Sequence, residues 1–128
     1  MSNEIILYNL ICDSDGKSLS GEKNYRLHLP EDIPACNFWS VIVYDNVMGL
    51  MIKTDQPWPS VHSRCRKMQV NQDGSVDIWL GPVAPEGKEH NWIKTIPGKE
   101  WNIILRLYEP REPWIDGAWK PGKIEEIN

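Results

Sequence analysis

Alternation between apolar and polar side chains is the main structural signal in three short stretches of the chain. In residues 25–29, one tyrosine and two leucines alternate with Arg26 and His28. Successive side chains of a β-strand point to opposite faces of its sheet, so this period of two predicts strands that bury one face. No stretch shows a convincing 3.6-residue helical period. The three predicted strands are residues 25–29, 76–80 and 101–108.

Residues 38–44 and residues 5–11 are apolar on both faces. A continuous apolar run is typical of a strand that is covered on both sides. We therefore expect residues 38–44 to lie between a second sheet and some other covering element. Residues 5–11 show the same pattern and predict a similar environment.

Turn residues separate the predicted strands. Residues 13–16 and 71–74 both end in Asp-Gly, where glycine adopts a positive φ at little cost. Ten prolines punctuate the rest of the chain, and proline cannot donate to a central ladder. Short strands between such turns predict a β-sandwich or a barrel. We expect residues 110–121 to form an extended arm packed by Trp114 and Trp119, and a frayed terminus is the alternative.

Composition and charge restrict the class of protein. A chain of 128 residues is expected to form one domain, and its net charge of −4 argues against a nucleic-acid partner. Its basic cluster at residues 64–67 is interpreted as a solvated loop. Three cysteines without a spacing pattern, Cys12, Cys36 and Cys65, predict reduced thiols. The N-terminal residues resemble neither a signal peptide nor a membrane span, so we expect a cytoplasmic protein with no membrane partner.

The sequence contains no motif for catalysis or metal binding. His28, His62 and His90 are far apart in the chain, and no C-x-x-C or H-E-x-x-H motif is present. There is no G-x-S-x-G nucleophile motif and no P-loop. We therefore predict no catalytic residue, no metal site and no cofactor.

A ligand-binding surface is the remaining chemical candidate. The strand faces that would point away from the core carry charged and aromatic side chains, and residues 89–92 add more. Aromatic planes beside amides, carboxylates and arginine are suited to hold a small polar or carbohydrate-like ligand. The alternative is that Trp79 and Tyr108 pack under the C-terminal tail or into another subunit. The candidate ligand-binding residues are Arg26, His28, Asp77, Trp79, His90, Asn91, Trp92, Arg106 and Tyr108.

Several motifs together give the chain a family resemblance. They lie at residues 24–30, 38–45, 54–61, 71–75, 81–92 and 106–116. Together they resemble domain of unknown function 1214, from about residue 13 to the end of the chain. The resemblance implies an all-β fold, an antiparallel β-sandwich of jelly-roll type. It divides the chain into an N-terminal strand, residues 1–12, and a single domain, residues 13–128.

In larger bacterial members this domain follows another uncharacterised domain, number 1254, which this sequence lacks. The resemblance implies no reaction, cofactor or catalytic residue. We therefore expect a stand-alone, non-catalytic binding or assembly module that forms a homo-oligomer. The interface candidates are Phe38, Ile42 and Tyr44, together with Ile6, Tyr8 and Leu10.

The alternative hypothesis is an enzyme or enzyme subunit that acts on a small polar or carbohydrate-like ligand. It would be favoured by a pocket that adjoins Trp79, Trp92 and Tyr108 and also holds an interacting titratable pair.

Overall fold

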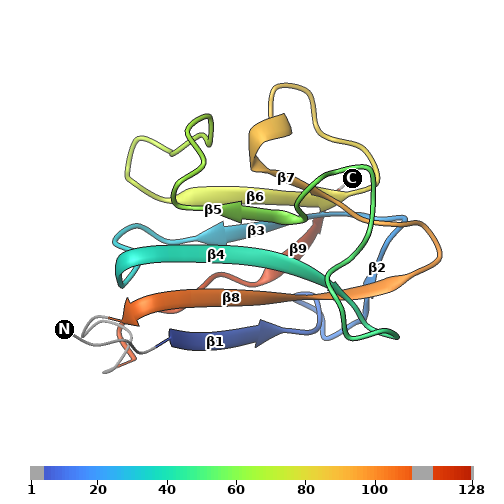
Figure 1. Ribbon diagram of the computed structural model, residues 1–128, viewed down its shortest axis with the longest axis horizontal. Helices are drawn as coiled ribbons and strands as arrows, with labels where there is room; N and C mark the ends of the chain where they lie inside the picture. The colour runs from blue at the N-terminus through green and yellow to red at the C-terminus, as the bar shows by residue number, and fades with distance from the viewer. Residues whose placement is uncertain (1–4, 111–116, 128) are drawn as a thin grey trace.

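Two β-sheets pack face to face to form the molecule (Figure 1). The computed structural model describes residues 5–110 and 117–127, except for the side chains of residues 36 and 37. The predicted all-β sandwich is confirmed, whereas the jelly-roll type stays a prediction.

The first sheet has five strands, all paired antiparallel. Its order is β1-β8-β4-β5, and the short β2 pairs with β8 beyond the end of β1. A β-bulge interrupts the pairing of β4 with β8 between Ala35 and Phe38. The strands are β1 (Ile5–Leu10), β2 (Leu19–Ser20), β4 (Ala35–Asp45), β5 (Ser60–His62) and β8 (Glu100–Pro110).

The second sheet has four strands in the order β7-β6-β3-β9. Strands β6 and β7 are parallel, and a one-turn 3-10 helix, η1 (Glu89–Asn91), leads into β7. This pair departs from the purely antiparallel sandwich that we expected. The strands are β3 (Asn24–Leu29), β6 (Val76–Gly81), β7 (Trp92–Lys94) and β9 (Ile124–Ile127).

The core lies between the two sheets and follows the predicted alternation. On β3, Tyr25, Leu27 and Leu29 are buried, while Arg26 and His28 remain partly exposed. Burying one Leu or Ile side chain stabilises the fold by about 1.5–3 kcal/mol. The fully buried aliphatic side chains of the two sheets include Leu27, Ile78, Leu80, Ile93, Ile103, Leu105, Leu107 and Ile124.

Both predicted Asp-Gly turns are present. The Asp13 carboxylate accepts hydrogen bonds from the backbone N–H groups of Asp15 and Lys17, each at 2.9 Å. Gly16 has a φ of 80° and Gly74 a φ of 91°, which is the left-handed region where glycine is favoured. The two turns therefore form for the predicted reason.

The C-terminal segment adds a strand that periodicity did not reveal. Strand β9 pairs with β3, and Trp119 ahead of it is buried. The Trp119 indole N–H donates to the carbonyl oxygens of Pro30 and Glu31. Trp119 therefore packs as expected, whereas Trp114 lies outside the described residues.

Strand β1 lies at the edge of the five-stranded sheet, and one of its faces is exposed. Ile6, Tyr8 and Leu10 point inward and pack against the core, so the outer surface of β1 is formed by other side chains, and their part in a contact through the strand edge stays a prediction. The side chains of Ile5 and Leu7 point the other way and are 48% and 61% exposed. Nothing among the described residues covers this face of β1, contrary to our expectation for residues 5–11.

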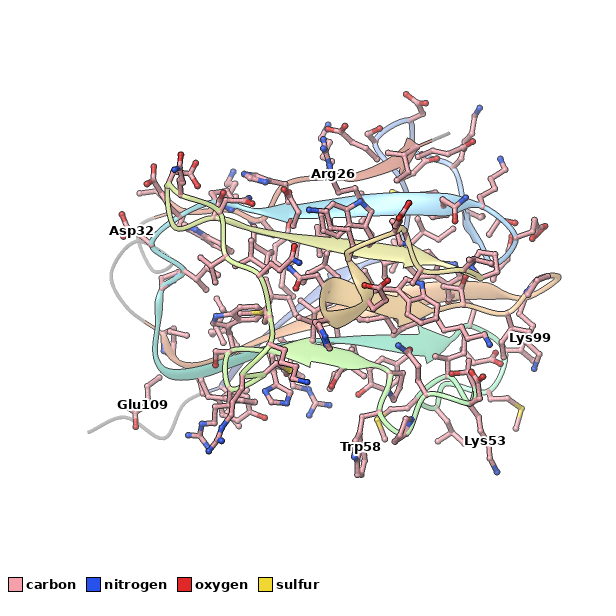
Figure 2. All side chains as sticks on the ribbon, turned by 90° about the horizontal axis from the view of Figure 1, so that it is seen from above. Arg26, Asp32, Lys53, Trp58, Lys99 and Glu109 are labelled. Atoms are coloured by element: carbon pink, nitrogen blue, oxygen red, sulfur yellow. The ribbon has the colours of Figure 1, made fainter. Side chains whose placement is uncertain are left out.

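The labelled side chains of Figure 2 locate the sides and ends of the sandwich. Arg26 projects from one side of the molecule, and Lys53 and Trp58 project from the opposite side. Asp32 lies near one end and Lys99 near the other.

Candidate functional site

The side of the five-stranded sheet that points away from the core is rich in apolar and aromatic side chains. We call it the outer face; alternate residues of β1, β8, β4 and β5 form it. Large apolar surfaces are where soluble proteins contact partners. The apolar and aromatic members of the outer face are Ile5, Leu7, Phe38, Ile42, Tyr44, Ile104 and Tyr108.

Aromatic rings form a cluster at one end of the outer face. The Phe38 ring lies 5.1 Å from the Tyr108 ring and 5.3 Å from the His62 ring, measured between centroids. The Arg64 guanidinium lies 5.0 Å from the centroid of the Phe38 ring. Offset and edge-on rings at these distances attract one another, as does a cation over a ring. The cluster thus forms an ordered surface with a positively charged margin.

Arg106 stands among these apolar side chains on β8. In the strand register it lies between Leu7 of β1 and Ser40 of β4. Its guanidinium donates a hydrogen bond of 2.8 Å to the Tyr44 hydroxyl, but its Nε is buried and has no hydrogen-bond partner in the part of the chain that the structure describes. None of the ion pairs within residues 5–110 and 117–127 includes Arg106. A guanidinium in such surroundings attracts an acidic group.

The second sheet presents a different surface, with a charged depression of about 450 Å³. Within it, His28 Nδ1 lies 2.7 Å from Asp77 Oδ1, and the other Asp77 oxygen accepts a hydrogen bond of 3.1 Å from the Asn71 amide. Arg26 lies beside them, 3.7 Å from Glu125 of β9. A carboxylate that orients an imidazole is the arrangement of a general base.

Gly122 closes one side of this depression because of its small size. Its N–H donates to the carbonyl oxygen of His28 at 2.7 Å. A Cβ on residue 122 would lie 2.6 Å from that oxygen, so only glycine lets the C-terminal segment approach β3 here. His28 is therefore held by Asp77 of β6 on one side and by the segment before β9 on the other.

Residues 88–92 serve mainly to join β6 to β7. Asn91 is buried, and its amide donates to the carbonyl oxygens of Gln69 and Asp77 at 2.9 and 2.8 Å. The Trp92 indole donates to the Gly81 carbonyl at 3.0 Å. Asn91 thus joins two backbone segments. Because its side chain is buried, it is not accessible to a ligand, which corrects its assignment to the predicted ligand-binding surface.

Trp79 and His90 remain accessible on this side of the molecule. Trp79 is half-buried, and the Lys88 ammonium lies 5.1 Å from its ring centroid. His90 is exposed. Both side chains lie near the loop that contains η1, where a ligand would meet an aromatic ring beside a cation.

The structure separates the nine predicted site residues into two groups. Arg26, His28, Asp77, Trp79 and Trp92 lie on the four-stranded sheet, and His90 and Asn91 belong to η1 beside it. Arg106 and Tyr108 lie on the outer face of the five-stranded sheet, on the other side of the core. Trp79 and Trp92 are thus on the opposite sheet from Tyr108, so the described residues do not bring these three side chains together in one surface.

Sequence reasoning missed Leu7 and Ile104 as members of the outer face. Ile104 interrupts the alternation of residues 101–108, because it is an apolar residue on the otherwise polar side of the strand. That interruption was the available signal. For Leu7, the signal was the strand itself, which has apolar side chains on both faces, so that one of these faces had to point away from the core.

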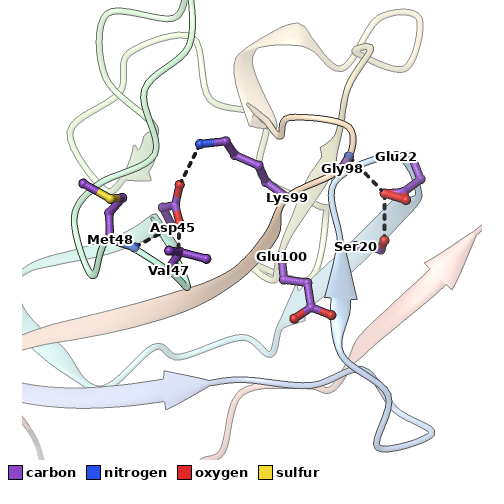
Figure 3. A pocket seen from close by; sticks show the side chains of 8 residues that line it. All are labelled: Ser20, Glu22, Asp45, Val47, Met48, Gly98, Lys99 and Glu100. Atoms are coloured by element: carbon purple, nitrogen blue, oxygen red, sulfur yellow. Dashed lines mark hydrogen bonds and ion pairs between the residues drawn. The ribbon is translucent and has the colours of Figure 1, made fainter.

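A further depression of about 540 Å³ opens at one end of the sandwich, beside the loop that follows β4 (Figure 3). The Asp45 carboxylate accepts hydrogen bonds from the N–H groups of Val47 and Met48, and these hold the pKa of Asp45 below its usual range. The Ser20 hydroxyl lowers the pKa of Glu22 in the same way. These carboxylates accept hydrogen bonds from backbone and side-chain groups around the depression, which accounts for the lowered pKa of each.

Within the described ranges, no three His, Cys, Asp or Glu side chains gather closely enough to hold a metal ion. The same part of the chain has no helix with the length and apolar character needed to cross a membrane.

Two crystal structures have the same fold as this chain. One is the VPA0106 protein from Vibrio parahaemolyticus, with 24% sequence identity and a TM-score of 0.83 over 98% of this chain. The other is a putative uncharacterized protein from Burkholderia cenocepacia, with 18% identity and a TM-score of 0.68 over 97% of this chain. This chain covers only 31% and 30% of those two chains.

No curated protein matches this chain. A family model matches residues 4–112, which include β1 and reach just beyond β8. The family is described as a protein of unknown function (DUF1214), and this chain belongs to it.

Proposed function

We propose that this domain is a non-catalytic binding and assembly module, and that its outer face is the contact surface between two copies of the chain. The observation that carries the proposal is the outer face itself, where exposed Ile5 and Leu7 lie beside a half-buried aromatic cluster. Burial of such a surface is favourable in proportion to the apolar area removed from water.

Strand β4 supports the same proposal from its sequence. Its inward side chains, Val41 and Val43, fill the core, whereas Ile42 and Tyr44 point outward. Strands that are apolar on both faces are typically covered on both faces. A second copy would supply the missing cover.

A two-fold symmetric contact is the simplest way for identical chains to cover the same surface. A stable contact of this kind buries about 800 Å² on each partner. The outer face has strands of up to 11 residues, so its length does not limit such a contact.

The test is the molar mass in solution, measured by light scattering over a range of concentrations. We expect the mass to approach twice 14.8 kDa, and Leu7→Asp to return it to 14.8 kDa. Leu7 is exposed at the sheet edge, so the variant should still fold. Val83→Asp is the matched control, because Val83 is 73% exposed and follows β6 in the other sheet. A wild-type monomer at every concentration would contradict the proposal.

A second candidate function follows from the His28–Asp77 pair. Its 2.7 Å contact at a charged depression favours an enzyme, or enzyme subunit, that acts on a small polar or carbohydrate-like ligand. Thermal-shift measurements with free monosaccharides and nucleotides test this candidate. A ligand at 100 times its Kd stabilises the fold by about 2.7 kcal/mol, and Asp77→Asn should abolish that shift while Glu86→Gln should not. If no compound shifts the wild-type melting temperature, this candidate has no support.

A further inference from the structure

We propose that Arg106 of one copy pairs with Glu100 of the partner subunit, and that this reciprocal pair sets the register of the dimer. The inference rests on the proposed function, because it specifies how two outer faces meet. It assigns an ion-pair site to two side chains that form no ion pair within residues 5–110 and 117–127.

Arg106 carries the first half of the argument. Its positive charge lies on an apolar face, and its guanidinium donates a hydrogen bond to the neutral Tyr44 hydroxyl. Among the described residues, its Nε is buried without a hydrogen-bond partner. A contact that covered this face would remove more water from the guanidinium. A buried charge is strongly unfavourable unless an opposite charge meets it, so the covering surface must supply a carboxylate.

Glu100 supplies the second half. It lies on β8 with the same alternation as Arg106, so its side chain projects from the same face. It is exposed and takes part in no ion pair among the residues that the structure describes. Figure 3 shows its carboxylate directed away from the Lys99–Asp45 pair. Glu100 is therefore a carboxylate available to a second molecule.

The spacing of these two residues suits a two-fold axis. Glu100 and Arg106 are on one strand, about 20 Å apart at 3.4 Å per residue, and Ile103 is midway between them. A two-fold axis that lies between the two facing sheets, perpendicular to the strands and over Ile103, sets the two β8 strands antiparallel. Arg106 then faces Glu100 of the partner subunit, and symmetry repeats the pair on the other side.

The same axis brings apolar side chains of β4 together. Val43 is the register partner of Ile103, so Ile42 would face Tyr44 of the partner subunit. Face-to-face sheets lie about 10 Å apart, a gap that large side chains from both sides fill. The ion pair and the contact between Ile42 and Tyr44 are therefore compatible with the same arrangement.

Other registers are less favourable for an electrostatic reason. An axis that crossed β8 at Arg106 would place two guanidinium groups opposite each other. Like charges at an interface disfavour association, and burial strengthens their repulsion. The position of Arg106 thus disfavours a dimer whose axis passes over Arg106 and favours the dimer whose axis passes over Ile103.

Charge reversal tests the pairing. We expect Glu100→Arg and Arg106→Glu each to raise the dimer dissociation constant about tenfold or more, and the double variant to restore it to within about threefold of wild type. Glu100 is exposed, so Glu100→Arg should fold even if Arg106→Glu does not. Glu86→Arg is the matched control, since Glu86 is an exposed acid after β6. Sedimentation equilibrium gives the constants.

The outcomes separate this inference from the function on which it rests. A dimer that Leu7→Asp dissociates, but that Glu100→Arg leaves unchanged, overturns the Arg106–Glu100 pairing and leaves the assembly function standing. A wild-type chain that remains monomeric overturns both. Loss of the dimer in Glu100→Arg, with recovery in the double variant, supports the pairing directly.

Discussion

The Trp101 indole ring meets the Tyr25 phenol ring edge-on in the core, with 5.4 Å between centroids and 79° between planes. Trp101 belongs to β8 and Tyr25 to β3, so the contact joins the two sheets. The Tyr25 hydroxyl also accepts a hydrogen bond of 3.0 Å from the Ser20 N–H in β2. Edge-on aromatic pairs contribute about 0.5–1.5 kcal/mol beyond their burial, and this pair holds three strands together.

The Tyr25 hydroxyl should therefore contribute measurably to stability. We expect Tyr25→Phe to lower the free energy of unfolding by about 1–2 kcal/mol, because the Ser20 N–H loses its acceptor. Urea denaturation measures the change. Tyr108→Phe is the control on the outer face and should change the monomer's stability by less than about 0.5 kcal/mol. Equal effects of the two substitutions would contradict this role for Tyr25.

Stability should also depend on the ionisation of Tyr25 at alkaline pH. Burial raises the pKa of Tyr25, whereas the unfolded chain releases this proton near the ordinary value of about 10. The contribution is fully present below that value and is lost as the pH rises through the folded-state pKa. We expect the wild-type stability to fall more steeply above about pH 10 than that of Tyr25→Phe. Unfolding curves at a series of alkaline pH values measure this, and parallel curves would refute it.

Asp45 should make the opposite contribution at acidic pH. The Val47 and Met48 N–H groups, with Lys99, lower the pKa of its carboxyl. Its stabilising effect is present above the unfolded value of about 3.9 and disappears as the pH falls toward the folded-state pKa. The stability difference between wild type and Asp45→Asn should therefore shrink below about pH 4. A difference that stays constant as the pH falls through this range would contradict this role of Asp45.

All three cysteines should be reduced. Cys12 is exposed and Cys65 is half-buried, and both are free thiols. A thiol reagent should label Cys12 of the native protein faster than Cys65, because access limits the reaction. In the unfolded, non-reduced protein, the count should reach all three cysteines of the sequence. A count of one would reveal a disulfide.

The local pattern of the sequence was sufficient to determine β3, β6 and β8 and the buried side of each. Alternation along β3 and β6 assigned Leu27 and Ile78 to the core, because the side-chain period of a strand is a property of its own backbone. The Asp-Gly turn at Gly16 was equally local, since it depends on the φ of one residue. The apolar second face of β4 predicted that Ile42 and Tyr44 belong to a surface, although not what covers it.

The tertiary structure alone decided which strands became neighbours. Alternation with a period of two predicts that a side chain points away from the core, but it does not predict to which sheet the strand belongs. Arg106 and His28 were therefore assigned to one surface, although they lie on opposite sides of the molecule. The pairing of β9 with β3, and of β6 with β7 in parallel, depends on contacts between residues distant in the chain. The Arg106 Nε became buried only when β1, β8 and β4 aligned, because burial is a property of packed neighbours and not of the strand that carries the residue.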